Sequence, residues 1–138
     1  MSRRGFSLIE VLAVLAILAV LAALVLPGFR AQILQGRRAE AREALQAVQL
    51  AQERFRSRNP RYADRLEALE HPATTRSSLY RLRIVQADAT TYTVEAIAQG
   101  TQGGDRPCRV LRLRLELGAI HTAGLDEQGA EQAACWPR

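Results

Sequence analysis

The apolar run near the start of the chain is the feature that most limits how it can fold. It extends from Phe6 to Leu26, and its only polar residues are Ser7 and Glu10. At the rise of an α-helix, a run of this length makes a rod of roughly 31 Å, which matches the hydrocarbon core of a bilayer. The run therefore predicts a helix that spans a membrane once.

Glu10 is the unusual residue of this predicted helix. A charge in lipid costs from about 3 to more than 10 kcal/mol, depending on the method, so an ionisable residue there is a functional hypothesis by default. In apolar surroundings a paired charge costs far less than a lone one. We therefore expect the carboxylate of Glu10 to meet a cation.

Two simpler interpretations explain the run less well. A cleaved secretory signal would share the basic start at Arg3 and Arg4, but its apolar segment would be shorter and would end in a small-x-small cleavage site. No two alanines of this run are spaced two apart. A plain membrane anchor would explain the length of the run, but not the presence of Glu10.

The order of residues from Gly5 to Glu10 resembles the signature of type IV prepilins and type II secretion pseudopilins. It consists of glycine, phenylalanine, a hydroxyl residue, two aliphatic residues and glutamate, behind a short basic segment. The resemblance is close over residues 1–28 and extends to the layout of the rest. It implies that residues 1–5 are a leader peptide, that prepilin peptidase cuts between Gly5 and Phe6, and that the same enzyme methylates Phe6.

The resemblance also assigns roles to the predicted membrane helix, residues 6–27. Glu10 would pair with the terminal amine of a neighbouring subunit in a helical filament, and Pro27 would kink or loosen the helix at the membrane surface. The implied partners are other pilin subunits, prepilin peptidase, an inner-membrane assembly platform and membrane lipid. The chain would cross the inner membrane once before assembly and stand in an extracellular pilus afterwards, with residues 28–138 forming a periplasmic or extracellular domain.

Residues 28–138 show the periodicity of an α+β domain. After Gly28, apolar residues at helical spacing predict that an amphipathic helix resumes and runs to about Arg58. Alternating residues then predict four strands, over residues 80–84, 92–96, 111–117 and 120–122, with residues 99–107 as a glycine-rich loop. We expect the pilin fold, in which the long helix packs against the leucine face of a four-stranded antiparallel sheet.

Cys108 and Cys135 are the only cysteines. In a domain outside the cytoplasm, two thiols predict a disulfide bond, which would stabilise by about 3.6 kcal/mol in the chain-entropy model. A free or metal-binding pair is the alternative, but no histidine or third cysteine has ligand spacing. The bridged loop resembles the variable region of type IVa pilins, and Cys135-Trp136 resembles PilE-like minor pilins and their DNA-receptor relatives.

Arginines on the polar side of two predicted strands are the candidate ligand-binding residues. They are Arg81, Arg83, Arg112 and Arg114. Glu95 and Glu116 lie on the same side and dilute the positive charge. The formal net charge of +5 is too mild to indicate nucleic-acid binding by itself. The simpler interpretation is a solvated sheet face, and contact with DNA is the alternative.

The chain shows no pattern of an enzyme, a cofactor site or a metal site. His71 and His121 have no nucleophile or carboxylate at a spacing that suggests catalysis. We therefore predict a structural minor type IV pilus subunit, resembling PilE-like minor pilins, that serves adhesion, twitching motility or DNA uptake. A type II secretion pseudopilin and a DNA-receptor minor pilin for competence are the alternatives.

Overall fold

The computed structural model describes residues 7–136, with Leu26 and Pro27 described by their backbone only. The predicted cleavage and methylation residues, Gly5 and Phe6, lie outside the described residues. The chain divides into two compact units, one up to Ile33 and the other from Leu34 onward. Each unit is described by itself.

The first unit is the N-terminal part of helix α1, which runs from Leu8–Arg56. By length and composition this is a helix that could cross a membrane, and none of its apolar window is buried within the protein. Apolar side chains such as those of Leu8 and Ile9 are exposed, so this segment requires an apolar environment. Glu10 is also exposed.

Helix α1 continues through Pro27-Gly28 without a break, so the single long N-terminal helix of the predicted pilin fold is confirmed. Proline removes one backbone hydrogen bond, a loss that membrane helices tolerate when neighbouring groups satisfy the freed carbonyl. The kink at Pro27 stays a prediction. The C-terminal part of α1, from Leu34, belongs to the second unit.

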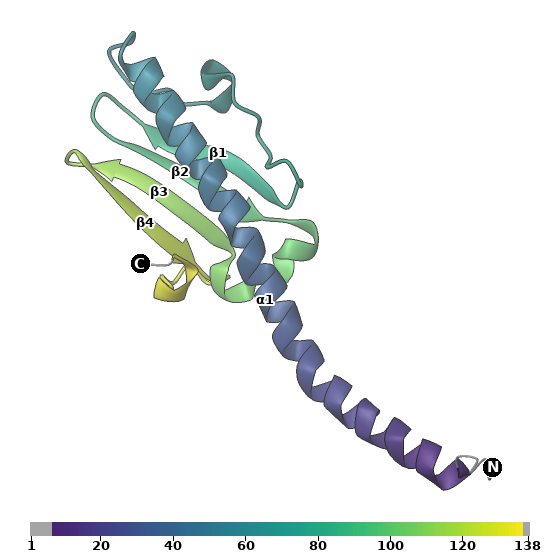
Figure 1. Cartoon of the computed structure of the whole chain (residues 1–138). Helices are drawn as coiled ribbons and strands as arrows, with labels where there is room; N and C mark the ends of the chain where they lie inside the picture. The colour runs from purple at the N-terminus through teal and green to yellow at the C-terminus, as the bar shows by residue number, and fades with distance from the viewer. Residues whose placement is uncertain (1–6, 137–138) are drawn as a thin grey trace. The chain divides into compact units, whose positions relative to one another are not determined.

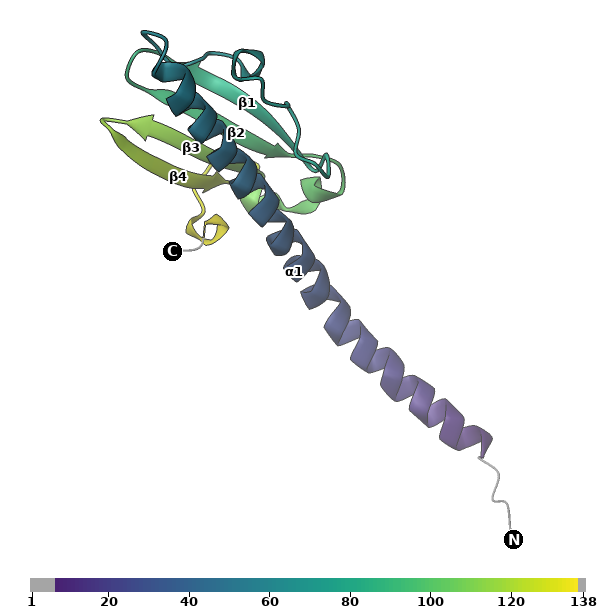
Figure 2. The same ribbon diagram turned by 45° about the horizontal axis from the view of Figure 1, so that its top comes forward.

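The second unit contains one antiparallel sheet in the order β1-β2-β3-β4. Its strands are β1 (Tyr80–Ala87), β2 (Tyr92–Ala98), β3 (Val110–Glu116) and β4 (Ala119–Leu125). The C-terminal part of α1 lies across one face of this sheet, as Figure 1 and Figure 2 both show. The α+β fold and the four strands predicted from the sequence are therefore confirmed.

The hydrophobic core lies between α1 and the sheet. Ala41, Leu45 and Val48 of α1 and alternate residues of the strands, such as Leu111 and Leu113, are fully or almost fully buried. This is the leucine face that the alternation predicts. Leu117 was expected on the same face, and that was wrong. β3 ends at Glu116, so the side chain of Leu117 points out of the sheet and is 97% exposed.

The connection between β2 and β3 is more ordered than the predicted loop. It forms two short 3-10 helices, η2 (Gly100–Gly104) and η3 (Arg106–Cys108). A further 3-10 helix, η1 (Leu66–Leu69), lies in the segment between α1 and β1. A last 3-10 helix, η4 (Ala133–Cys135), holds the second cysteine. The structure confirms the disulfide bond between Cys108 and Cys135.

A buried polar network joins α1 to the β2–β3 connection. Arg38 donates from Nε and Nη2 to the two carboxylate oxygens of Asp105, at 2.7 and 2.8 Å. Gln102 donates from Nε2 to the Leu34 carbonyl and to the Tyr80 hydroxyl. The Asp105 carboxylate raises the pKa of Arg38, and burial raises the pKa of Tyr80 to about 12. Arg38 therefore stays charged and Tyr80 stays neutral, and their hydrogen bonds hold the β2–β3 connection against α1.

Candidate functional site

The outer face of the sheet, turned away from α1, carries the four predicted arginines. In the strand register Arg83 of β1 lies opposite Glu95 of β2, which lies opposite Arg112 of β3. The next row places Thr93 beside Arg114, and Arg114 beside His121 of β4. Arg81 lies opposite Ile97 at the edge strand.

Glu95 is the centre of this face. Arg83 donates from Nε and Nη2 to Oε2 of Glu95, at 3.0 and 2.8 Å. Arg112 donates from the same two nitrogens to Oε1, at 2.9 and 2.7 Å. Each carboxylate oxygen thus accepts two charge-assisted hydrogen bonds, which are the stronger kind. We call Arg83, Glu95 and Arg112 the arginine clamp.

The arginine clamp differs from the sequence-based prediction in one respect. Glu95 was expected to face water and dilute the positive charge, but its side chain is only 3% exposed, whereas those of Arg83 and Arg112 are 55% and 36% exposed. The guanidinium groups cover the carboxylate because a strand at the sheet centre has a partner on each side. The solvent therefore meets two cations above a buried anion.

Arg114 adds a third guanidinium on the same face. It donates from Nη2 to Oε1 of Glu116 at 2.8 Å, and both side chains are close to half-exposed. A cavity of about 300 Å³ lies beside it. Its lining consists of Arg112, Arg114, Glu116, His121, Thr122, Ala123 and Glu131.

This arrangement is suited to an anion that has several charges. The clamp fixes the planes of two guanidinium groups, and their Nη1 groups have no hydrogen-bond partner within residues 7–136. A planar guanidinium matches the geometry of phosphate and carboxylate oxygens, and fixing it beforehand lowers the entropy lost on binding. Arg83 and Arg112 lie two strands apart, roughly 10 Å at the backbone, but their guanidinium groups converge on the one carboxylate of Glu95.

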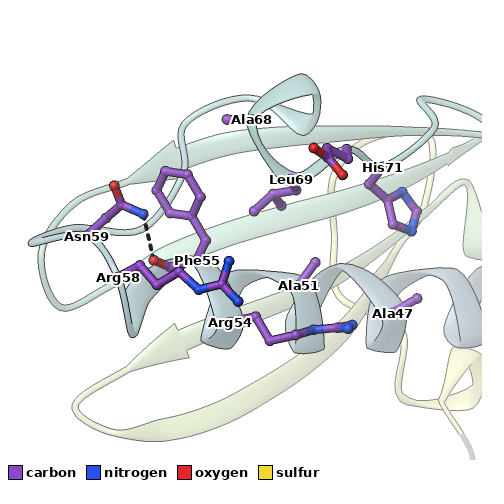
Figure 3. A pocket seen from close by; sticks show the side chains of 10 residues that line it. Ala47, Ala51, Arg54, Phe55, Arg58, Asn59, Ala68, Leu69 and His71 are labelled. Carbon is purple, nitrogen blue, oxygen red and sulfur yellow. Dashed lines mark hydrogen bonds between the residues drawn. The ribbon is translucent and has the colours of Figure 1, made fainter.

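A second concave surface lies between α1 and η1 with the two residues after it, and has a volume of about 470 Å³. Figure 3 shows Phe55 and Leu69 facing each other across it, with Arg54 and Arg58 on the helix side and His71 at one end. Helical periodicity does not predict this cleft, because it depends on η1 and the residues after it lying near α1.

The turns at one end of the sheet hold the remaining features of interest. Asp88 accepts hydrogen bonds from the backbone and hydroxyl groups of Thr90 and Thr91, and these hold its pKa down to about 2. In the β3–β4 turn, Leu117 and Gly118 have φ angles of 52° and 77°. Within residues 7–136, no group of histidine, cysteine, aspartate or glutamate side chains is arranged to hold a metal ion.

Two protein-family models match parts of the chain. Residues 27–112 match the model of a family described as "Type IV minor pilin ComP, DNA uptake sequence receptor". Residues 1–26 match the prokaryotic N-terminal methylation motif. Among curated proteins, none matches the chain. The first match covers more than half of the chain and includes the whole arginine clamp, while Arg114, Leu117 and Cys135 lie beyond it.

Proposed function

This chain belongs to the family described as "Type IV minor pilin ComP, DNA uptake sequence receptor", and we propose that it is the pilus subunit that binds duplex DNA for uptake. Pilin families are structural rather than enzymatic. Membership implies that this chain is processed by prepilin peptidase and assembles with other pilins. The type II secretion pseudopilin alternative loses support, because residues 27–112 match a pilin model.

The arginine clamp is the observation that carries the proposal. Phosphate contacts dominate the affinity of proteins for DNA, and they come mostly from arginine and lysine. Hydrogen bonds to Glu95 fix the orientations of Arg83 and Arg112. Arg114 lies on the same face of β3, two residues after Arg112. Arg81 lies at the edge of this face and adds a fourth positive charge. The outer face of the sheet is therefore the DNA-binding surface that we propose.

The N-terminal segment has the roles that its resemblance to prepilins implies. We propose cleavage between Gly5 and Phe6, methylation of Phe6, and pairing of Glu10 with the terminal amine of a neighbouring subunit. The exposed apolar part of α1 anchors the chain in the inner membrane before assembly, and the assembly platform moves it into the pilus. The sheet domain then stands outside the cytoplasm, where it can meet DNA.

A salt titration of DNA binding tests the proposal. Full-length protein in lipid nanodiscs is mixed with fluorescent duplex DNA, and binding is followed by anisotropy from roughly 50 to 200 mM salt. The test variant is Arg81→Gln with Arg114→Gln, because neither arginine bonds to Glu95 and the clamp stays intact. The matched control is Arg65→Gln with Arg76→Gln, which removes the same charge from exposed residues outside the strands.

We expect the wild-type protein to bind with an affinity that falls steeply as salt rises. Each lost phosphate contact lowers the log-log salt slope by about 0.9, so the test variant should lose up to about 1.8 while the control keeps its slope. Equal loss in the test and control variants would exclude Arg81 and Arg114 as phosphate contacts. Absence of binding at low salt would reject DNA binding altogether. Adhesion or motility would then be the remaining pilus functions.

A further inference from the structure

The β3–β4 turn contains a leucine that the fold does not favour at that position. Leu117 and Gly118 are the two residues between β3 and β4, and both have positive φ angles. Such turns strongly prefer asparagine, aspartate or glycine, because the Cβ of other residues clashes with the backbone in the left-handed region. Leucine there lowers the folding equilibrium constant by roughly five- to thirtyfold.

The side chain of Leu117 does not compensate for this strain through packing. It is 97% exposed, a larger fraction than for any other large apolar side chain in the described part of the chain. Single exposed apolar residues are common on proteins and need no explanation. An exposed apolar side chain on a strained backbone does need an explanation, because strained residues cluster at functional sites.

The surroundings of Leu117 favour an anionic partner. Figure 1 and Figure 2 show the β1–β2 and β3–β4 turns at the same end of the sheet, beside the C-terminal end of α1. At this end Arg56 donates to the Ala89 carbonyl and Arg61 to the Ala87 carbonyl. On the outer face, Arg114 lies three residues before Leu117.

Two carboxylates also lie at this end, and Asp88 keeps its negative charge because its partners are neutral. Asp88 accepts from Thr90 and Thr91, and Glu116 accepts from Arg114. The end of the sheet therefore has one exposed leucine, with three arginines against two carboxylates among the groups named here. Duplex DNA has the matching chemistry, because it carries phosphates on the outside, and an apolar side chain can enter from a groove between the stacked faces of neighbouring bases.

We propose that Leu117 is a wedge that inserts between neighbouring base pairs of duplex DNA and kinks it, an inference that rests on the DNA-binding function proposed above. DNA-bending proteins use leucine and other apolar side chains in this way, with kinks of about 20–90°. The flexible TA and CA/TG steps are the easiest to unstack, so the wedge selects duplexes by their deformability. Leu117 lies outside the residues that match the family model.

The test compares two substitutions of Leu117 with a matched control. Leu117→Asn introduces a residue that the turn prefers. Leu117→Gly removes the side chain and is also compatible with the turn. The control, Leu50→Gln, removes another exposed leucine, from α1. Full-length proteins in nanodiscs are titrated with a duplex that has dyes at both ends and one central TA step, and energy transfer between the dyes reports the bend.

We expect both Leu117 variants to bind about tenfold more weakly, with the energy-transfer change lost and the salt slope kept, because leucine contacts no phosphate. Leu117→Asn should also raise the midpoint of thermal unfolding, which excludes misfolding as the cause. Leu50→Gln should behave like the wild type.

Unchanged affinity and bending in both variants would overturn the wedge and leave binding by the arginines intact. If the wild type binds no duplex at all, the proposed function fails first and the wedge fails with it. If Leu117→Asn instead binds and bends DNA normally but no longer cross-links to neighbouring subunits in pili, the tip is a contact between proteins and the wedge is rejected.

Discussion

Replacement of Glu95 by glutamine tests the arginine clamp. The carboxylate accepts four hydrogen bonds, two from Arg83 and two from Arg112. An amide has the same shape but only one acceptor oxygen, and its NH₂ group would face the N–H groups of the other arginine. Two charge-assisted bonds are then lost, and donors meet donors.

The cost of Glu95→Gln can be worked out from these contacts. A bond to a charged group contributes about 1.5–3 kcal/mol net, and removal of one partner of a buried pair costs about 3–5 kcal/mol when the other charge stays buried. Here both arginines are partly exposed and can regain water. We therefore expect a loss of about 2–4 kcal/mol in the free energy of unfolding.

Denaturant unfolding in detergent micelles, followed through the fluorescence of Trp136, measures this loss. The matched control is Glu116→Gln, which breaks the exposed pair with Arg114 and should cost about 0.2–1 kcal/mol. Equal losses for Glu95→Gln and Glu116→Gln would refute the reasoning, because they would mean that burial of the carboxylate adds nothing.

Three further predictions concern the turns and the helix. Asp88→Asn should lower stability at neutral pH, because the native state stabilises the ionised carboxylate. The difference in stability from the wild type should vanish as the pH falls from 3.8 to about 2, which thermal melts across that range would measure. Gly124→Ala should destabilise by about 1–3 kcal/mol and hinder closure of the Cys108–Cys135 disulfide, which leaves free thiols for labelling, since the added carbon would lie 2.0 Å from Cys135 Cβ. The carbon added by Gly104→Ala meets no atom within 4 Å. Glu10→Ala should still insert into membranes but be missing from sheared pili, which immunoblots of both fractions would reveal.

Periodicity was enough to predict most of the fold. The apolar spacing from Ala41 to Val48 placed the packed side of α1, and the alternation around Leu113 placed the buried face of the sheet. The disulfide between Cys108 and Cys135 followed from there being two cysteines in a domain outside the cytoplasm. These features depend on local spacing or on residue counts, which a sequence shows directly.

Features that depend on neighbours across strands could not be predicted in the same way. Alternation placed Glu95 on the outer face, but it does not show that arginines on both flanking strands would cover it. It also continued the buried face one residue too far, to Leu117, because leucine gives no signal for a left-handed turn. The cleft at Phe55 arises only when η1 and the residues after it lie near the helix.

The use of arginine for every basic residue gives the outer face two functions at once. A lysine at position 83 would be a single point charge directed at Glu95, with no fixed edge left for a ligand. The guanidinium of Arg83 instead uses Nε and Nη2 for the carboxylate and keeps Nη1 for solvent or a phosphate. The same bonds that stabilise the sheet therefore also orient the groups that we propose to contact DNA.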